Sequence, residues 1–137
     1  GLYLKNTRWI NNWDLVDVSA EHIVGAHLWT RDRSALDALA ASELLWERRI
    51  AVLATFHFIR RGAFADTLRI AERLAGDRED LMHKAVGWML REVGKRDRAV
   101  LDDFLAEHAA RMPRTMLRYA IEKHTVAERA RWRAVRR

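Results

Sequence analysis

The segment from Asn11 to Asp17 combines a possible helix cap with an indole and a carboxylate. Either asparagine at its start, Asn11 or Asn12, can cap a helix by accepting a hydrogen bond from a free backbone N–H. If Asn12 is the cap, Trp13 and Asp17 are four residues apart and share one helix face. A carboxylate held there can stabilise a developing positive charge and place a water molecule, so Asp17 and Trp13 are candidate catalytic residues.

The acids of this segment also have a structural interpretation. Acidic residues in the first turn of a helix interact favourably with its dipole, which accounts for Asp14. It accounts less well for Asp17, whose face continues through the apolar residues Ala20 and Val24. A carboxylate beside an indole on a half-apolar face is unusual for a solvated helix, so both interpretations stay open.

Two adjacent arginines, Arg48 and Arg49, differ in the helix face that each one shares. The face of Arg48 tolerates a charged side chain more readily. The face of Arg49 carries core-type residues: Leu45, Val52, Phe56 and Ile59. A guanidinium among core positions needs an anion or several acceptors, because burying an unpaired charge is very costly. Its partner is either an acid such as Glu47 or a phosphate group, which arginine can grip with two N–H donors. Arg49 is therefore the candidate phosphate ligand, and Arg48 is the alternative.

Trp88 follows Gly87 inside an expected helix. A glycine in mid-helix costs about 1 kcal/mol relative to alanine, so it usually admits another group at close range. Trp88 lies at the edge of a core stripe formed by Met82, Val86, Met89 and Val93. From this pattern alone, packing is the commoner role for such a tryptophan, and a platform for a ligand is the alternative.

Paired cations recur at equivalent ends of two expected helices, so they should project from one side of the molecule. Helix C-termini favour cations in any protein, but the repetition also fits a track of phosphate contacts. The candidate contacts on this track are Arg60, Arg61, Lys95, Arg96, Arg114 and Arg118, beside Arg48 and Arg49.

Several other kinds of site lack their sequence signature. His22 and His27 are five residues apart and share a face poorly, and there is no HExxH motif, so we expect no metal site. There is also no phosphate-binding glycine loop, no GxSxG motif and no cysteine. We expect the remaining tryptophans to serve packing: Trp9, Trp29, Trp46 and Trp132.

The elements that must position these residues are predicted to be helices throughout. The expected spans are 13–30, a short helix through 36–40, 43–61, 64–74, 78–93, 97–111, one beginning near Pro113, and a last one after Thr125.

Local signals predict where several of these helices begin and end. Ser42 and Asp77 are the expected caps of 43–61 and 78–93. Gly62 is the expected C′ residue of the first, and Gly94 should follow the second. Thr125 with Glu128 has the spacing of a capping box.

Composition bounds the class of protein. The chain has 137 residues, half of them hydrophobic, with one proline and a formal net charge of +6. This is enough for one domain with a real core, and the charge favours an anionic partner such as nucleic acid. We find no membrane-spanning run and no signal peptide, and the absence of cysteine is compatible with the cytoplasm.

Two segments of the chain can be laid over each other at an offset of about 37 residues. Each contains a long helix, a basic turn and a shorter amphipathic helix. This is typical of an α-solenoid, whose stacked helix pairs form an extended concave surface.

Four blocks carry a resemblance to a known family: RWINNWDLVD, LWERRIAVLATFHFIRRG, HKAVGWMLREVGKRD and MPRTMLRYAIEK. In this order they resemble the bacterial DNA alkylation repair enzymes of the AlkD type, which are HEAT-like-repeat DNA glycosylases. The resemblance implies one all-α, HEAT-like helical-repeat domain over residues 1–137, equivalent to the C-terminal part of the family domain. Members of the family carry further N-terminal helices, and this chain begins just before the first block.

The resemblance implies excision of alkylated purines such as 3-methyladenine and 7-methylguanine from duplex DNA in the bacterial cytoplasm. Asp17 matches the catalytic carboxylate, Trp13 and Trp88 match the two tryptophans that flank the lesion, and Arg49 matches the phosphate-holding arginine. No metal or organic cofactor is implied.

The alternative is a non-catalytic helical-repeat module that binds DNA or a protein. In the family, the N-terminal helices complete the groove and cover the helix expected here at 13–30. A partner or such a segment would then be needed to cover its apolar face.

Overall fold

The computed structural model describes residues 24–28 and 33–135, and helices are the only regular elements within these ranges. They are α3 (Ala26–Leu28), α4 (Ser34–Ala40), α5 (Leu45–Ala54), α6 (Phe56–Ile59), α7 (Ala65–Leu74), α8 (Asp80–Arg96), α9 (Arg98–His108), the 3-10 helix η3 (Ala109–Arg111), α10 (Arg114–Ala120) and α11 (Val126–Ala134). The predicted all-α fold is confirmed. None of the described helices is long and apolar enough to cross a membrane.

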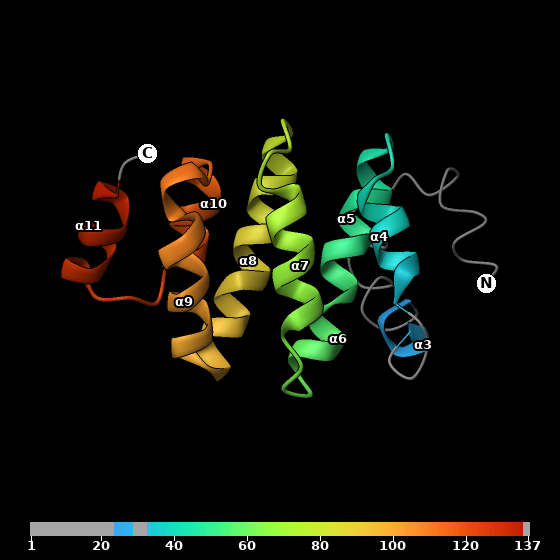
Figure 1. Cartoon of the computed structure of the whole chain (residues 1–137), viewed down its shortest axis with the longest axis horizontal. Helices are drawn as coiled ribbons and strands as arrows, with labels where there is room; N and C mark the ends of the chain where they lie inside the picture. Colours follow the sequence, from blue (N-terminus) through green and yellow to red (C-terminus); the bar gives the residue numbers. More distant parts are fainter. Residues whose placement is uncertain (1–23, 29–32, 136–137) are drawn as a thin grey trace.

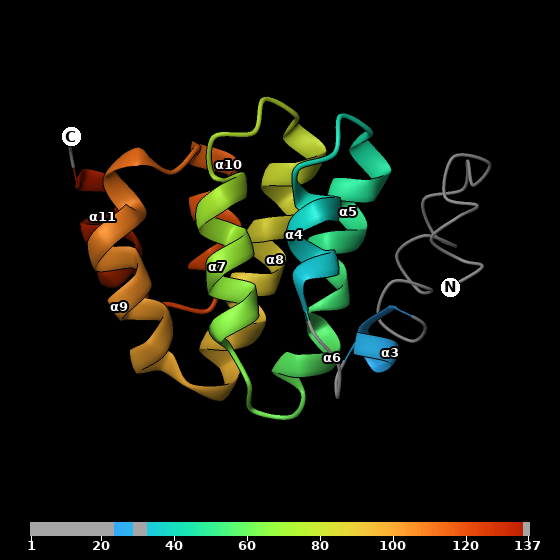
Figure 2. The same ribbon diagram turned by 45° about the vertical axis from the view of Figure 1, so that its right-hand side comes forward.

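Successive helices stack in pairs along the molecule (Figure 1). The pairs are α4 with α5, α7 with α8, and α9 with α10. Turned by 45°, the molecule shows two layers: α4, α7 and α9 form one, and α5, α8 and α10 form the other (Figure 2). This arrangement agrees with the predicted stack of paired helices.

The core lies between the two layers, where each helix presents its apolar face. Its largest fully buried side chains are Phe58, Leu36, Ile50, Ile59, Ile70, Met82, Met89, Leu90, Leu101, Leu105, Met116 and Ile121. Truncating one of the leucines or isoleucines to alanine should cost about 2–5 kcal/mol of stability.

Glycines set the distance between neighbouring helices. A Cβ atom on Gly87 of α8 would lie 2.6 Å from both the Met116 carbonyl oxygen and the Tyr119 Cβ of α10. A Cβ atom on Gly25 would lie 2.5 Å from the Ala54 carbonyl oxygen of α5. The close neighbour expected at Gly87 is therefore the backbone of α10, which approaches at a distance that a side chain would prevent.

Two predicted helix ends are confirmed by local geometry. Gly62 has a φ of 78°, the left-handed conformation expected of a residue that closes a helix. Thr125 and Glu128 form a capping box, in which each side chain accepts a hydrogen bond from the other residue's backbone N–H. In addition, the Asp97 carboxylate accepts a hydrogen bond from the Val100 N–H and caps α9.

The predicted helix 43–61 begins later and is interrupted. The Ser42 hydroxyl accepts a hydrogen bond from the Leu44 N–H, so it orders the turn before α5 instead of capping the helix. Helix α5 ends at Ala54, and α6 begins after Thr55. The buried Thr55 hydroxyl donates to the Val52 carbonyl at 2.6 Å, a side-chain bond to the preceding turn that bends helices.

The predicted boundaries of 78–93 are also wrong. Helix α8 begins at Asp80, and Asp77 does not cap it. One carboxylate oxygen of Asp77 instead accepts a hydrogen bond from the Glu79 N–H, before the helix starts. Gly94 does not follow the helix, because α8 continues to Arg96. A Cβ atom on Gly94 would lie 2.4 Å from Leu101 Cδ2, so this glycine makes room for α9.

Candidate nucleic-acid interface

Phe56 and Trp88 meet where α6 lies against α8. Phe56 is the first residue of α6, and Trp88 lies near the middle of α8. Their ring centroids are 6.0 Å apart and their planes meet at 68°, an edge contact of the kind that aromatic pairs favour. Both rings are half-buried and pack against the core with one part of their surface.

Two guanidinium groups lie over the ring of Phe56. The Arg60 guanidinium carbon is 4.4 Å from the ring centroid, and that of Arg96 is 5.6 Å away. The structure therefore brings together two arginines that the sequence placed at equivalent helix ends. Phe56, Arg60, Trp88 and Arg96 are called the Phe56 surface below.

Glu92 anchors the basic end of α8. Glu92 is only 6% exposed, and its carboxylate accepts hydrogen bonds from Lys95 at 3.0 Å and Arg96 at 3.1 Å. Burial acts to raise the pKa of Glu92, but the bonds from Lys95 and Arg96 outweigh it and hold this pKa below its usual value. One buried negative charge thus holds two cations in place beside Trp88, and the cluster keeps a net positive charge.

The adjacent arginines of α5 have different surroundings. Arg48 donates to the Asp77 carboxylate at 2.7 Å and also to the Ser42 and Glu43 carbonyl oxygens. Arg49 donates to the Leu81 carbonyl oxygen at 3.0 Å, in a bond on the exposed side of α8. Arg48 is therefore paired with an acid 29 positions away along the chain.

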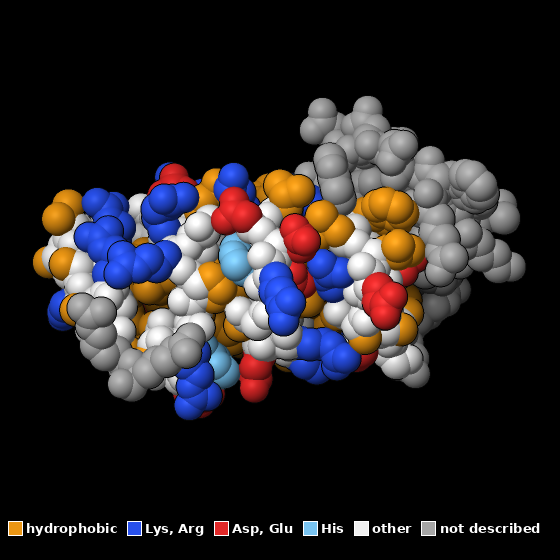
Figure 3. Space-filling view, turned by 90° about the horizontal axis from the view of Figure 1, so that it is seen from above, with side chains coloured by type: hydrophobic (Ala, Val, Ile, Leu, Met, Phe, Trp, Pro, Cys, Tyr) orange, Lys and Arg blue, Asp and Glu red, His pale blue; other side chains and the backbone are white. Residues whose placement is uncertain are grey.

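The other predicted phosphate contacts lie apart from the Phe56 surface. Arg61 is exposed and donates to the His57 carbonyl oxygen at 2.9 Å. Arg114 and Arg118 line a cavity of about 380 Å³ near α11, together with Arg133. Viewed from above, Lys and Arg side chains gather over this end of the molecule (Figure 3).

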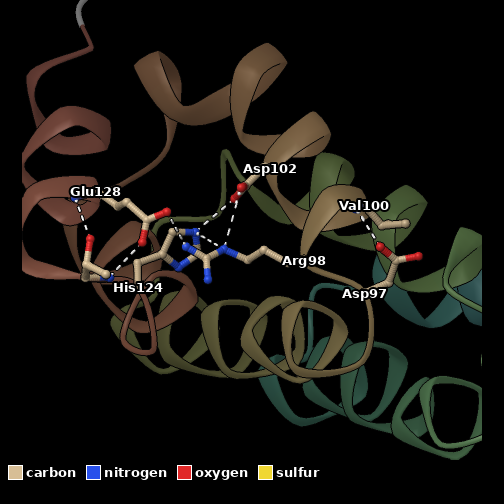
Figure 4. A network of polar contacts seen from close by, with 7 residues as sticks. Asp97, Arg98, Val100, Asp102, His124 and Glu128 are labelled. Carbon is tan, nitrogen blue, oxygen red and sulfur yellow. Dashed lines mark hydrogen bonds and ion pairs between the residues drawn. The ribbon is translucent and has the colours of Figure 1, made fainter.

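A polar network ties α9 to α11 (Figure 4). The Arg98 guanidinium donates to His124 Nε2 at 2.9 Å and pairs with Glu128 at 2.8 Å and with Asp102 at 3.5 Å. His124 is 4% exposed, and its Nε2 lies 2.9 Å from Asp102 Oδ1. These four residues are called the α9–α11 corner below. Sequence reasoning identified Glu128 only as a cap, since its other partner is distant along the chain.

A family model described as DNA alkylation repair enzyme matches residues 1–124. The chain belongs to this family. No curated protein and no solved structure matches it significantly. As a DNA alkylation repair protein it has a role in DNA repair, with DNA as its partner. Helix α11 lies beyond the matched residues.

Two candidate catalytic residues of this DNA alkylation repair protein, Trp13 and Asp17, lie outside the described residues. Trp9 and Trp29 do so as well. Trp132 packs against the core, as expected of a packing residue. Within residues 24–28 and 33–135, no three His, Asp or Glu side chains are grouped so that they could hold a metal ion.

Proposed function

We propose that this DNA alkylation repair protein hydrolyses the N-glycosidic bond of cationic alkylated purines, such as 3-methyladenine and 7-methylguanine, in duplex DNA. The observation that carries the proposal is the Phe56 surface. There, Trp88 lies beside two arginines on an aromatic ring, in a chain that belongs to a DNA alkylation repair family. Aromatic faces suit a cationic base, and arginines suit the phosphates around it.

The chemistry makes modest demands on the protein. Alkylation at a ring nitrogen gives the base a positive charge, so the base leaves as a neutral molecule when it takes the electron pair of the glycosidic bond. A strong general acid is therefore unnecessary. The site must stabilise the oxocarbenium-like sugar and place the water that attacks it, which one carboxylate can do. This proposed mechanism requires no metal and no organic cofactor.

The proposed catalytic residues have different roles. Asp17 stabilises the sugar cation and positions the water. Trp13 and Trp88 flank the lesion nucleotide with electron-rich faces. Arg49 holds the adjacent phosphate, and Arg48, whose side chain donates to Asp77, is the alternative.

The surrounding cations bind the duplex backbone more generally. Residues on the two helix ends next to Phe56 make the nearer contacts, and two residues of α10 make the farther ones. The proposed set is Arg60, Arg61, Lys95, Arg96, Arg114 and Arg118.

The test is release of 7-methylguanine from a duplex under single-turnover conditions. Asp17→Asn keeps the size of the side chain but removes its charge, so we expect excision to fall by about a hundredfold or more. Binding to undamaged duplex should hardly change. Asp14→Asn is the matched control, because that acid is expected to act only on helix stability.

Two outcomes would overturn the proposal. Equal losses in Asp17→Asn and Asp14→Asn would mean that Asp17 only favours the start of a helix. Tight binding of methylated duplex without any base release would indicate the alternative function, a non-catalytic helical-repeat module that binds DNA.

A further inference from the structure

We propose that Phe56 is a positioning residue of the site, whose single ring orients both the Trp88 indole and the guanidinium groups of Arg60 and Arg96. The inference rests on the proposed function, because it assigns these groups to a lesion nucleotide and its phosphates. Phe56 would act through them and need not touch the DNA itself.

Phe56 lies at a helix break. The pattern of the predicted helix 43–61 placed residue 56 on the core face that it shares with Arg49. The helix is interrupted at Thr55, and after this break Phe58 is fully buried while Phe56 is only half-buried. Because one side of the ring remains at the surface, it is available to side chains from the neighbouring helix.

Phe56 also contacts Trp88. A tryptophan on a helix surface can change rotamer, and holding it in one orientation requires a neighbour that fits that orientation. The Phe56 ring supplies this neighbour at 6.0 Å and 68°. Gly87 also helps to hold Trp88 in place, because the close approach of α10 at this glycine fixes the backbone of α8 next to Trp88.

Two arginines are arranged around the Phe56 ring. A guanidinium that stacks on a ring keeps its N–H donors in the plane of the group, where they can reach a phosphate. Arg60 directly follows α6, and Arg96 is the last residue of α8. The Phe56 ring therefore contacts one cation from the end of each of these two helices. Glu92 holds Arg96 from the other side.

Substitution at Phe56 tests the proposal through excision. Phe56→Leu keeps an apolar side chain but removes the ring, and we expect the single-turnover rate to fall about three- to tenfold. Phe56→Tyr keeps the ring and should stay within about twofold of the wild type. Phe104→Leu, an aromatic substitution in α9, is the matched control and should leave the rate unchanged at a temperature where all variants are folded.

A double-mutant cycle separates positioning from general stability. If Phe56 acts through Trp88, Phe56→Leu should cost much less in a Trp88→Ala background than in the wild type. Full additivity of the two losses would contradict the proposal. So would equal losses in Phe56→Leu and Phe56→Tyr, since the aromatic ring would then have no special role.

A spectroscopic measurement keeps this inference distinguishable from the proposed function. The chain has six tryptophans, and 5-fluorotryptophan labelling gives each a ¹⁹F resonance, with that of Trp88 assigned by its loss in Trp88→Phe. We expect Phe56→Leu to shift the Trp88 resonance, and Phe56→Tyr and Phe104→Leu to leave it in place. If the wild type releases no base, the proposed function fails while this shift still reports the positioning of Trp88. An unmoved Trp88 resonance in Phe56→Leu would overturn the inference whether or not base is released.

Discussion

Arginines are used in opposite ways in two regions of this molecule. In the α9–α11 corner, Arg98 lies among Asp102, Glu128 and His124, and its guanidinium interacts with all three. On the Phe56 surface, Arg60 lies over an aromatic ring. The first arrangement fastens one helix to another, whereas the second keeps a cation at the surface in a defined orientation.

This comparison shows that the number of arginines in a region says little about anion binding. A guanidinium paired with carboxylates has its charge balanced and its donors used, and its removal mainly affects packing and stability. A guanidinium over a ring is oriented by the ring, and its planar N–H donors can reach a phosphate. Arg96 combines both arrangements, because Glu92 holds it while it also lies over Phe56.

The largest expected difference between the two regions concerns their tryptophans. Trp88→Ala should slow single-turnover excision by about ten- to thirtyfold, because one flanking face for the cationic base is lost. Trp132→Ala, in α11, should leave the excision rate unchanged while loosening the packing of that helix. Comparable losses of activity in the two variants would remove the distinction between the regions.

A smaller difference is expected in the salt dependence of duplex binding. Replacing both Arg60 and Arg96 by methionine removes two phosphate contacts, so the slope of log affinity against log salt should become shallower by about 1.8. Arg98→Met is the control and should leave the slope unchanged, because its cation is already balanced by acids. A slope that changes equally in the two variants would contradict this account.

Features with local causes could be predicted from the sequence. The helical class, the stacking in pairs, the closing glycine Gly62 and the Thr125–Glu128 capping box depend on periodicity or on residues a few positions apart. The family resemblance was likewise carried by contiguous blocks of sequence. These signals are present before any tertiary contact forms.

Features that depend on distant neighbours could not be predicted. Gly94 was expected after a helix, but it lies inside α8 because Leu101 of α9 needs the space. Asp77 was expected as a cap, but one of its oxygens is held by Arg48. Phe56 was assigned to a core face, but it is half-buried and directly follows the break at Thr55. The sequence contains the break-forming threonine, but threonine also occurs in unbroken helices.

The smallest expected effect is a pH dependence confined to the α9–α11 corner. Hydrogen bonds from the Thr125 backbone and hydroxyl, and then from Arg98, lower the pKa of Glu128 to about 2, from the 4.5 that is usual for a glutamate side chain. Because the folded-state pKa is the lower one, this contribution to stability is complete above about pH 4.5 and is lost as the pH falls towards 2. The Trp132 contribution to fluorescence, isolated by difference with Trp132→Phe, should report loosening of α11 in this window.

Glu128→Gln provides the control for that titration. It should remove this component of the change while leaving excision at neutral pH unaffected. A titration that is the same in Glu128→Gln and the wild type would show that Glu128 does not fasten the corner.

The most direct test of the central claim is a photo-crosslink between DNA and the Phe56 surface. The probe is a duplex with 7-methylguanine on a 2′-fluoro sugar, which resists excision because fluorine destabilises the sugar cation, and with 5-iododeoxyuridine beside the lesion. Irradiation followed by mass spectrometry should place the crosslink on the peptide that contains Trp88, and Phe56→Leu should reduce its yield. A crosslink on the peptide that contains Trp132, with none at Trp88, would contradict the assignment of the DNA site to the Phe56 surface.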